Sequence, residues 1–241
     1  MAGTFKGLRR TPISSAPGRI PQQQVSIGRR NQSSSKNWMQ RHVKDNFVQQ
    51  SKADHVVSRS YYKLEWMDQK CKLLHRYKPN TVIDIGAAPG GWTSYCIRQS
   101  VFQIVAVDLL PLDPGVVAEG IRELGPDGFQ AIQGDVTDLR HLLTEQSPTL
   151  ILSDMAPNFM GDKRTDAIRC MGLCEQALEY AISSLGKRGS FVSKFFSGPE
   201  EHELKLYAKQ YFEKVQVVKP PASRSESAEQ YLVATKFLGQ E

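Results

Sequence analysis

Short apolar runs alternate with segments of helical periodicity along most of this chain, and this alternation constrains the fold more than any other feature. The apolar runs predict strands over residues 81–85, 103–108, 130–133, 150–153, 190–195, 215–218 and 231–237. Helical periodicity predicts helices over residues 58–74, 91–99, 166–185 and 201–212. Because strands connected through helices lie parallel, this order predicts an α/β fold with helices on both faces of a mostly parallel sheet.

The last two predicted strands differ from the others because no helix separates them. Strands joined so closely pair antiparallel. We therefore expect a seven-stranded sheet with six parallel strands and one antiparallel strand. The glycine-rich stretch at residues 115–128, which contains Pro126, predicts a long loop between the second and third strands.

The basic residues are concentrated at the N-terminus. Residues 1–44 contain nine Lys and Arg and no acidic residue, while the other 22 basic residues are accompanied by all 25 acidic ones. The same segment is rich in Ser, Gln, Pro and Gly, a composition that cannot bury a core. We expect residues 1–36 to form a basic extension and residues 37–241 to form one globular domain, whose share of apolar residues suits a domain of this size.

Two interpretations of the basic segment remain open. An Arg-rich, Ser-rich and acid-free segment is typical of an organellar transit peptide, and also of an arm that contacts RNA. No apolar run reaches the roughly 18 residues that a membrane span needs, and no secretory signal is evident. We expect a protein that is neither membrane-bound nor secreted.

The four cysteines, Cys71, Cys96, Cys170 and Cys174, include no Cys-x-x-Cys pair. No histidine lies at a spacing that would complete a zinc site, so we expect reduced core cysteines and no metal.

A glycine-rich turn follows the first predicted strand, in the stretch Asp84-Ile-Gly-Ala-Ala-Pro-Gly-Gly-Trp92. Gly86, Gly90 and Gly91 allow the backbone to turn tightly and to approach a ligand at the carboxyl edge of the sheet. The spacing is not Gly-x-Gly-x-x-Gly, and we expect no free helix N-terminus that would bind a pyrophosphate. A nucleoside with few phosphates fits this turn better than a dinucleotide.

Two carboxylates follow at later strand ends. Asp108 ends the second strand, where it can accept hydrogen bonds from ribose hydroxyls, and Asp135 follows the third strand, where it can bind the exocyclic amine of an adenine. A glycine turn with these two carboxylates in this order predicts S-adenosylmethionine as the cofactor. The alternative is that both residues only cap helices.

Four further motifs accompany the glycine turn, namely Ser58-Arg-Ser-Tyr-Tyr-Lys-Leu64, Asp108-Leu-Leu-Pro-Leu-Asp-Pro114, Ser153-Asp-Met-Ala-Pro-Asn158 and Ser223-Arg-Ser-Glu-Ser-Ala-Glu-Gln-Tyr231. With these motifs the chain resembles the FtsJ/RrmJ family of ribosomal RNA uridine 2′-O-methyltransferases over residues 37–237. The resemblance implies a class I S-adenosylmethionine-dependent methyltransferase with a Rossmann-like fold. It also implies cofactor contacts from Gly90, Trp92, Asp108, Asp135 and Asp154.

The same resemblance implies a catalytic Lys-Asp-Lys-Glu tetrad. The residues that match the family motifs are Lys63, Asp154, Lys194 and Glu229. Glu226 is the alternative for the last position, but only Glu229 keeps the Glu-x-Tyr spacing.

Strand order supports this grouping independently. If the fourth, fifth and seventh strands are neighbours and the seventh runs backwards, Asp154, Lys194 and Glu229 meet at one edge of the sheet. Lys63 must then arrive from the N-terminal helix. We expect Lys194 to be the general base for the ribose hydroxyl, with its pKa lowered by Lys63. The alternative is that Lys194 stays charged and only orients the hydroxyl, with its position set by Asp154.

The function that the resemblance implies is methylation of a uridine ribose in large-subunit ribosomal RNA, for a mitochondrial-type member of the family. The partner would be this RNA within a precursor particle, with no DNA and no membrane, and the protein would act as a monomer in the mitochondrion. Cytoplasm, nucleolus and the bacterial cytoplasm are the alternative locations. Alternative functions are methylation of transfer RNA and a non-catalytic role in ribosome assembly.

Overall fold

The computed structural model describes residues 45–74, 80–136 and 147–239. A seven-stranded sheet has the order β3-β2-β1-β4-β5-β7-β6. Its strands are β1 (Thr81–Ile85), β2 (Gln103–Asp108), β3 (Phe129–Gln133), β4 (Leu150–Ser153), β5 (Ser190–Phe196), β6 (Phe212–Val218) and β7 (Glu229–Phe237). β7 pairs antiparallel with both β5 and β6, and the five strands from β3 to β5 are parallel. The predicted fold class and the single antiparallel strand are confirmed.

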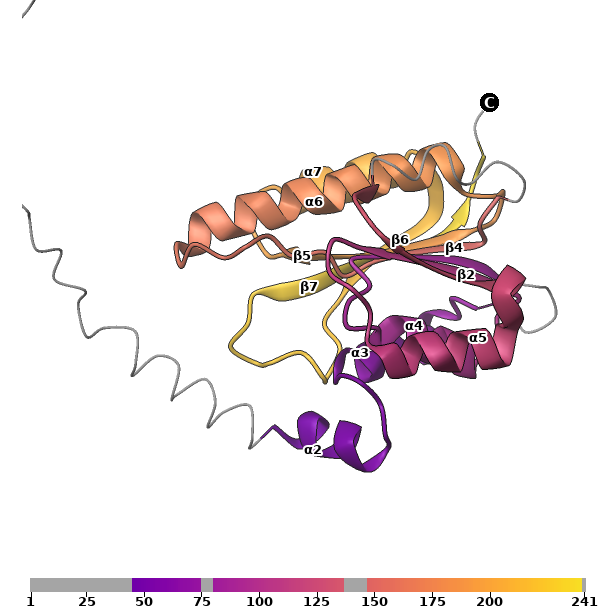
Figure 1. Ribbon diagram of the computed structural model, residues 1–241. Helices are drawn as coiled ribbons and strands as arrows, with labels where there is room; N and C mark the ends of the chain where they lie inside the picture. The colour runs from indigo at the N-terminus through magenta and orange to yellow at the C-terminus, as the bar shows by residue number, and fades with distance from the viewer. Residues whose placement is uncertain (1–44, 75–79, 137–146, 240–241) are drawn as a thin grey trace, which may run out of the picture. The chain divides into compact units, whose positions relative to one another are not determined.

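Helices cover both faces of the sheet (Figure 1). One face carries α3 (Ser60–Cys71), α4 (Gly91–Arg98) and α5 (Pro114–Gly128), and the other carries α6 (Lys163–Ser184) and α7 (Glu201–Ala208). The residues of β1 are buried throughout, as a strand covered on both faces requires. The apolar runs in the sequence therefore correspond to strands that helices cover on both faces of the sheet.

The carboxyl ends of the parallel strands lie at one edge of the sheet, where side chains that follow them can meet. β1 ends at Ile85, β2 at Asp108 and β4 at Ser153. β7 runs in the opposite direction, and its first residue, Glu229, is opposite Phe196 at the end of β5. This reversal brings the start of β7 to the same edge.

The prediction of a loop at residues 115–128 was wrong, because these residues form α5. Asp113 caps the helix by accepting a hydrogen bond from the Gly115 amide at 2.8 Å, and Pro114 occupies the first turn. The glycines suggested a loop, but Gly120 serves packing. A Cβ atom on Gly120 would lie 2.6 Å from ring atoms of Phe129 in β3. Gly125, with φ of +74°, kinks the helix before Pro126.

Two other boundaries differ from the prediction. The helix α2 (Asn46–Ala53) was not predicted, and Asp45 caps it by accepting a hydrogen bond from the Phe47 amide. The predicted helix over residues 201–212 ends at Ala208, and Phe212 begins β6 instead. Phe212 pairs with Phe237 across the sheet, with ring centroids 5.2 Å apart. Cross-strand burial of these two rings outweighs helical periodicity at this position.

Some predictions lie outside the described residues. They include the basic extension over residues 1–36 and the first eight residues of the predicted domain. Among the described helices, none has the length and the apolar composition needed to cross a bilayer.

Two glycine substitutions separate packing from helix propensity. Gly120→Ala should lower the free energy of unfolding by about 1–3 kcal/mol, because its methyl group overpacks against Phe129. Gly172→Ala, the matched control in α6, should raise it by up to about 1 kcal/mol, since an added Cβ meets nothing within 4 Å. Urea unfolding of both variants measures the difference. Equal shifts in the two variants would contradict the packing role of Gly120.

Candidate active site

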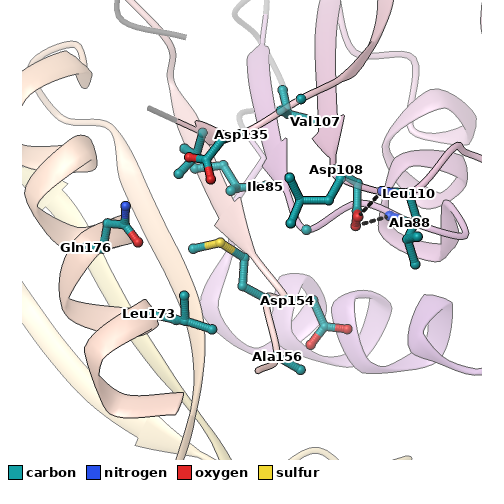
Figure 2. Close-up of a pocket in the computed structure, with 15 residues that line it drawn as sticks. Ile85, Ala88, Val107, Asp108, Leu110, Asp135, Asp154, Ala156, Leu173 and Gln176 are labelled. Carbon is teal, nitrogen blue, oxygen red and sulfur yellow. Dashed lines mark hydrogen bonds between the residues drawn. The ribbon is translucent and has the colours of Figure 1, made fainter. Parts of the chain in front are cut away.

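A cavity of about 330 Å³ lies at the carboxyl edge of β1, β2 and β4 (Figure 2). Four residues that the sequence singled out line it, namely Gly86, Asp108, Asp135 and Asp154. Apolar side chains make up much of the remaining wall, including Ile85, Leu109, Leu110, Val136 and Leu173. A cavity with apolar walls and a few carboxylates suits an adenosine-like ligand.

The glycine turn lies directly against the segment that follows β4. Gly86 has φ of +72°, and a Cβ atom there would lie 2.8 Å from the Met155 amide nitrogen. The Gly86 amide donates a hydrogen bond to the Val107 carbonyl at 2.8 Å. Only glycine allows this conformation together with this close approach, so the turn holds β1, β2 and the segment at Met155 together.

Asp108 has a structural as well as a possible ligand role. Its two carboxylate oxygens accept hydrogen bonds from the Ala88 and Leu110 amides, each at 2.8 Å, as the dashed lines in Figure 2 show. These bonds connect the end of β2 to the glycine turn. Each carboxylate oxygen still has capacity for a further donor, so a ribose hydroxyl could bind the oriented group.

Three residues predicted to bind the cofactor, Gly90, Gly91 and Trp92, do not line the cavity. The Trp92 side chain is buried on the α3 side of the sheet, and its indole N–H donates a hydrogen bond to the Ser60 carbonyl at 2.9 Å. A Cβ atom on Gly91 would meet side-chain oxygens of Ser58 and Ser60. The described contacts of Gly91 and Trp92 therefore fix α4 against the start of α3.

Helix α4 begins at Gly91, immediately after the turn, as predicted. Its position does not favour a phosphate, however. The first helical residues lie against Ser58 and Ser60 and not in the wall of the cavity.

The four tetrad residues form two adjacent ion pairs. Lys63 Nζ lies 2.7 Å from Glu229 Oε1, and Lys194 Nζ lies 3.0 Å from Asp154 Oδ1. Lys194 also donates a hydrogen bond to the Asp154 carbonyl oxygen. Both lysines are buried, with exposed fractions of 6% and 7%. The structure thus brings together the four residues that the sequence placed in the tetrad.

Tyr231 links the two ion pairs, and sequence reasoning did not assign it a role. Its hydroxyl accepts a hydrogen bond from Lys63 Nζ at 3.1 Å and donates one to Asp154 Oδ1 at 3.3 Å. The ring is fully buried. The Glu-x-Tyr spacing was the available signal, because residues two apart on a strand share a face.

Glu229 has a further donor in Ser223. Ser223 Oγ donates a hydrogen bond to Glu229 Oε1 at 2.7 Å. Burial alone would raise the pKa of Glu229, but Lys63, Ser223 and Lys194 outweigh it and lower the pKa below its ordinary value. Glu229 is therefore ionised at neutral pH. Glu226, the alternative for this position, hydrogen-bonds instead to its neighbour Ser225.

The expectation that Lys63 lowers the pKa of Lys194 was wrong. Burial alone would lower that pKa, but the carboxylates of Asp154 and Glu229 outweigh it and raise the pKa above its ordinary value. The physical reason is that each lysine has its own carboxylate, so the repulsion between the two cations is compensated. Lys194 is protonated in this structure at neutral pH.

A second cavity, of about 310 Å³, adjoins the tetrad. Its lining includes the charged residues Lys194, Glu226, Glu229, Arg59 and Arg224 and the aromatic residues Phe159 and Phe196. Ala156 lines both cavities. Asp154 lines the first cavity and Lys194 lines the second, so the ion pair between them connects the two cavities.

Asp84 is a buried carboxyl group that sequence reasoning did not single out. Thr93 Oγ1 donates a hydrogen bond to Asp84 Oδ2 at 2.7 Å, and Oδ1 has no hydrogen-bond partner among the described residues. Burial raises the pKa of this carboxyl to about 7, despite the hydrogen bond from Thr93. An acidic residue inside the apolar run of β1 was the signal.

The described residues contain no group of three or more His, Cys, Asp or Glu side chains that could hold a metal ion. Of the predicted core cysteines, Cys96, Cys170 and Cys174 are buried thiols, whereas Cys71 is half-buried.

Comparison with known proteins places this geometry in a family. The FtsJ-like methyltransferase family model matches residues 56–237. Ribosomal RNA large subunit methyltransferase E of Mesorhizobium japonicum is 43% identical over 216 residues, which cover 86% of this chain and 77% of that protein. The protein of the same name from Caulobacter vibrioides is 38% identical over 240 residues, which cover 99% of this chain and 97% of that protein.

One solved structure has a similar fold and a similar description. A crystal structure described as a ribosomal RNA methyltransferase of Plasmodium falciparum superimposes with a TM-score of 0.61 and 25% sequence identity. It covers 76% of this chain and 99% of its own length. The residues matched by the family model, 56–237, include every residue named in the lining of the two cavities.

The buried Asp84 carboxyl should make stability depend on pH. Because its pKa is raised from 3.8 to about 7 on folding, its protonated form stabilises the native state fully below about pH 4, and this contribution is lost as the pH rises to 7. Asp84→Asn removes the titration. Between pH 4 and pH 8, the free energy of unfolding of the variant should therefore rise by on the order of 4 kcal/mol relative to that of the wild type.

Urea unfolding of both proteins across this pH range measures that gain. Asp127→Asn, which changes an exposed carboxylate, gives the baseline. A difference between Asp84→Asn and wild type that stays constant from pH 4 to pH 8 would contradict the raised pKa.

Proposed function

This chain belongs to the FtsJ-like methyltransferase family, and we propose that it methylates the 2′-hydroxyl of a uridine in large-subunit ribosomal RNA. It is an S-adenosylmethionine-dependent ribosomal RNA methyltransferase, as relatives at 36–43% identity indicate. The observation that carries the proposal is that tetrad residues line two cavities that share Ala156: Asp154 lines the first, and Lys194 and Glu229 line the second. Such a site can bring a methyl donor and a ribose together in line.

The first cavity fits the cofactor. Asp108 is oriented by two backbone amides toward the position of a ribose, while Asp135 and the exposed Leu109 and Leu110 line the same wall. When bound, S-adenosylmethionine supplies an electrophilic methyl group on a positively charged sulfur. Gly86 lines this cavity, and its lack of a side chain leaves room for Met155, which lines it as well.

Lys194 and Asp154 are the residues that we assign to the ribose hydroxyl. Lys194 uses one N–H for the Asp154 carbonyl and one for its carboxylate, so a third N–H of the ammonium can bind the 2′-oxygen. The raised pKa of Lys194 favours this charged, orienting role over that of a neutral base. As the oxygen gains its methyl group, the hydroxyl proton passes to the Asp154 carboxylate.

Lys63, Glu229 and Tyr231 position this pair. The Lys63–Glu229 ion pair neutralises a charge next to Lys194, and the Tyr231 hydroxyl contacts both Lys63 and Asp154. Burying two lysines beside two half-buried carboxylates for stability alone is unattractive, because desolvation of the charges offsets much of their attraction. The cluster therefore argues against a non-catalytic assembly factor.

The identity of the target nucleotide is part of the proposal. Ribose methylation mapped on large-subunit ribosomal RNA, with and without the protein, should show one uridine whose mark depends on the protein. The same measurement on transfer RNA tests the alternative substrate. If ribose methylation depends on the protein in transfer RNA but not in ribosomal RNA, transfer RNA is the substrate. If methylation depends on the protein in neither RNA, the result supports the assembly factor.

The role of Lys194 predicts a pH profile. If Lys194 acts charged, single-turnover methyl transfer should vary little between pH 7 and pH 9, because its raised pKa keeps it protonated. A neutral base would instead make the rate rise about tenfold per pH unit over this range. Lys194→Met should abolish transfer, whereas Lys209→Met, on the exposed surface beyond α7, should not. A wild-type rate that rises steeply with pH would instead support Lys194 as the general base.

The compartment and the substrate particle are also proposals. The two interpretations of residues 1–44 differ in testable ways, and alignment of a Caulobacter protein over 99% of this chain favours an RNA-contacting arm over a mitochondrial transit peptide. A fusion of residues 1–44 to a fluorescent protein should then stay outside mitochondria. Import and cleavage of the fusion would instead support the mitochondrial location.

We propose a precursor particle of the large subunit as the substrate.

A further inference from the structure

We propose that the stacked rings of Phe159 and Phe196 form a platform on which the base of the target nucleotide stacks while its ribose lies against Lys194. This inference rests on the proposed function and adds the residues that position the base. We define the aromatic platform as these two rings only.

The geometry of the two rings suits a base. Their centroids are 5.7 Å apart and their planes differ by 5°, which is a parallel, offset arrangement. Phe159 has an exposed fraction of 57%, although a large apolar ring is favoured in the core. Phe196 lies two residues after Lys194 on β5, so both side chains point to the same face of the sheet.

The position of the aromatic platform identifies its occupant. Both rings line the second cavity together with Lys194 and Glu229. A base is covalently attached to the ribose that carries the reacting hydroxyl. If that hydroxyl binds Lys194, the base must therefore occupy the same cavity, whose volume of about 310 Å³ lies within the range of small-ligand pockets.

Contacts from α6 hold Phe159 in place before any ligand arrives. Asp166, which is buried, accepts hydrogen bonds from the amides of Met160 and Gly161 at 2.9 and 3.1 Å. Arg169 donates one to the Asn158 carbonyl at 2.8 Å. These bonds flank Phe159 on both sides in the chain. An ordered ring costs less conformational entropy on binding than a mobile one.

The charges around the cavity fit the sugar and phosphate groups on either side of a base. Arg59 and Arg224 line it, and both pair with a single carboxylate, that of Asp45. Guanidinium groups bind phosphate oxygens through paired N–H donors, and Glu226, which lines the same cavity, offsets part of their charge. Stacking itself is tolerant of base identity, so the aromatic platform positions the base and does not select uracil.

Methyl-transfer kinetics on the large-subunit particle test the aromatic platform. Because stacking of one base is worth about 1–3 kcal/mol, Phe159→Ala should lower kcat by about 5- to 150-fold. KM should change less than about twofold, since contacts with phosphates dominate RNA affinity. Phe159→Leu keeps an apolar side chain but no ring face, and should behave like Phe159→Ala. Phe159→Trp should restore kcat to within about threefold of wild type.

Phe102→Ala is the matched control. Phe102 has the same exposed fraction of 57% and lies just before β2, outside both cavities. Its substitution should leave kcat unchanged. Affinity for S-adenosylmethionine should be equal in all variants, because Phe159 does not line the first cavity.

Either of two results would overturn the aromatic platform. One is a kcat of Phe159→Ala within twofold of that of Phe102→Ala. The other is a kcat of Phe159→Leu as high as that of Phe159→Trp. Its failure is distinguishable from failure of the proposed function. A wild-type protein that transfers no methyl group to the particle refutes the proposed function, and the aromatic platform with it. A wild type that transfers normally, with no effect of Phe159→Ala, refutes the aromatic platform alone.

Discussion

Tyr231 Oη lies between two buried ion pairs, and the rest of the candidate site depends on the hydrogen bonds that it makes with Lys63 at 3.1 Å and Asp154 at 3.3 Å. A buried lysine is costly unless a carboxylate compensates it, and two adjacent lysines raise that cost. Here each lysine has its own carboxylate, and a neutral hydroxyl joins the two pairs. This arrangement keeps Lys194 protonated, and so changes its proposed role from base to oriented donor.

The arrangement requires that α3 be fixed accurately, because Lys63 is the member of the network that a helix carries. Trp92 and Gly91 meet this requirement from α4, through the indole hydrogen bond to Ser60 and through a close approach that excludes a side chain. Trp92 also packs against Tyr231, with ring centroids 5.7 Å apart. Gly91 and Trp92, which resembled cofactor contacts in the sequence, therefore contact α3 and Tyr231 in the described structure.

Local sequence was sufficient wherever burial on both faces of the sheet determined the pattern. The run Leu150–Ser153, with three apolar residues, predicted β4 correctly, and β1 and β2 matched over their full lengths. It was insufficient for α5, because Gly120 is required by the Phe129 ring, which follows nine residues later on a neighbouring strand. The same limit applied to Phe212, whose partner Phe237 is brought to it by the pairing of β6 with β7.

The sequence alone indicated the fold class and the succession of strands along the chain, and its resemblance to a known family indicated which four charged residues belong together. The tertiary structure alone decided how those charges interact. The pairing of each lysine with one carboxylate, the bridging position of Tyr231 and the stacking of Phe159 on Phe196 depend on distances between segments far apart in the chain. Electrostatic interaction and desolvation both vary steeply with those distances, so residue types and spacing cannot specify them.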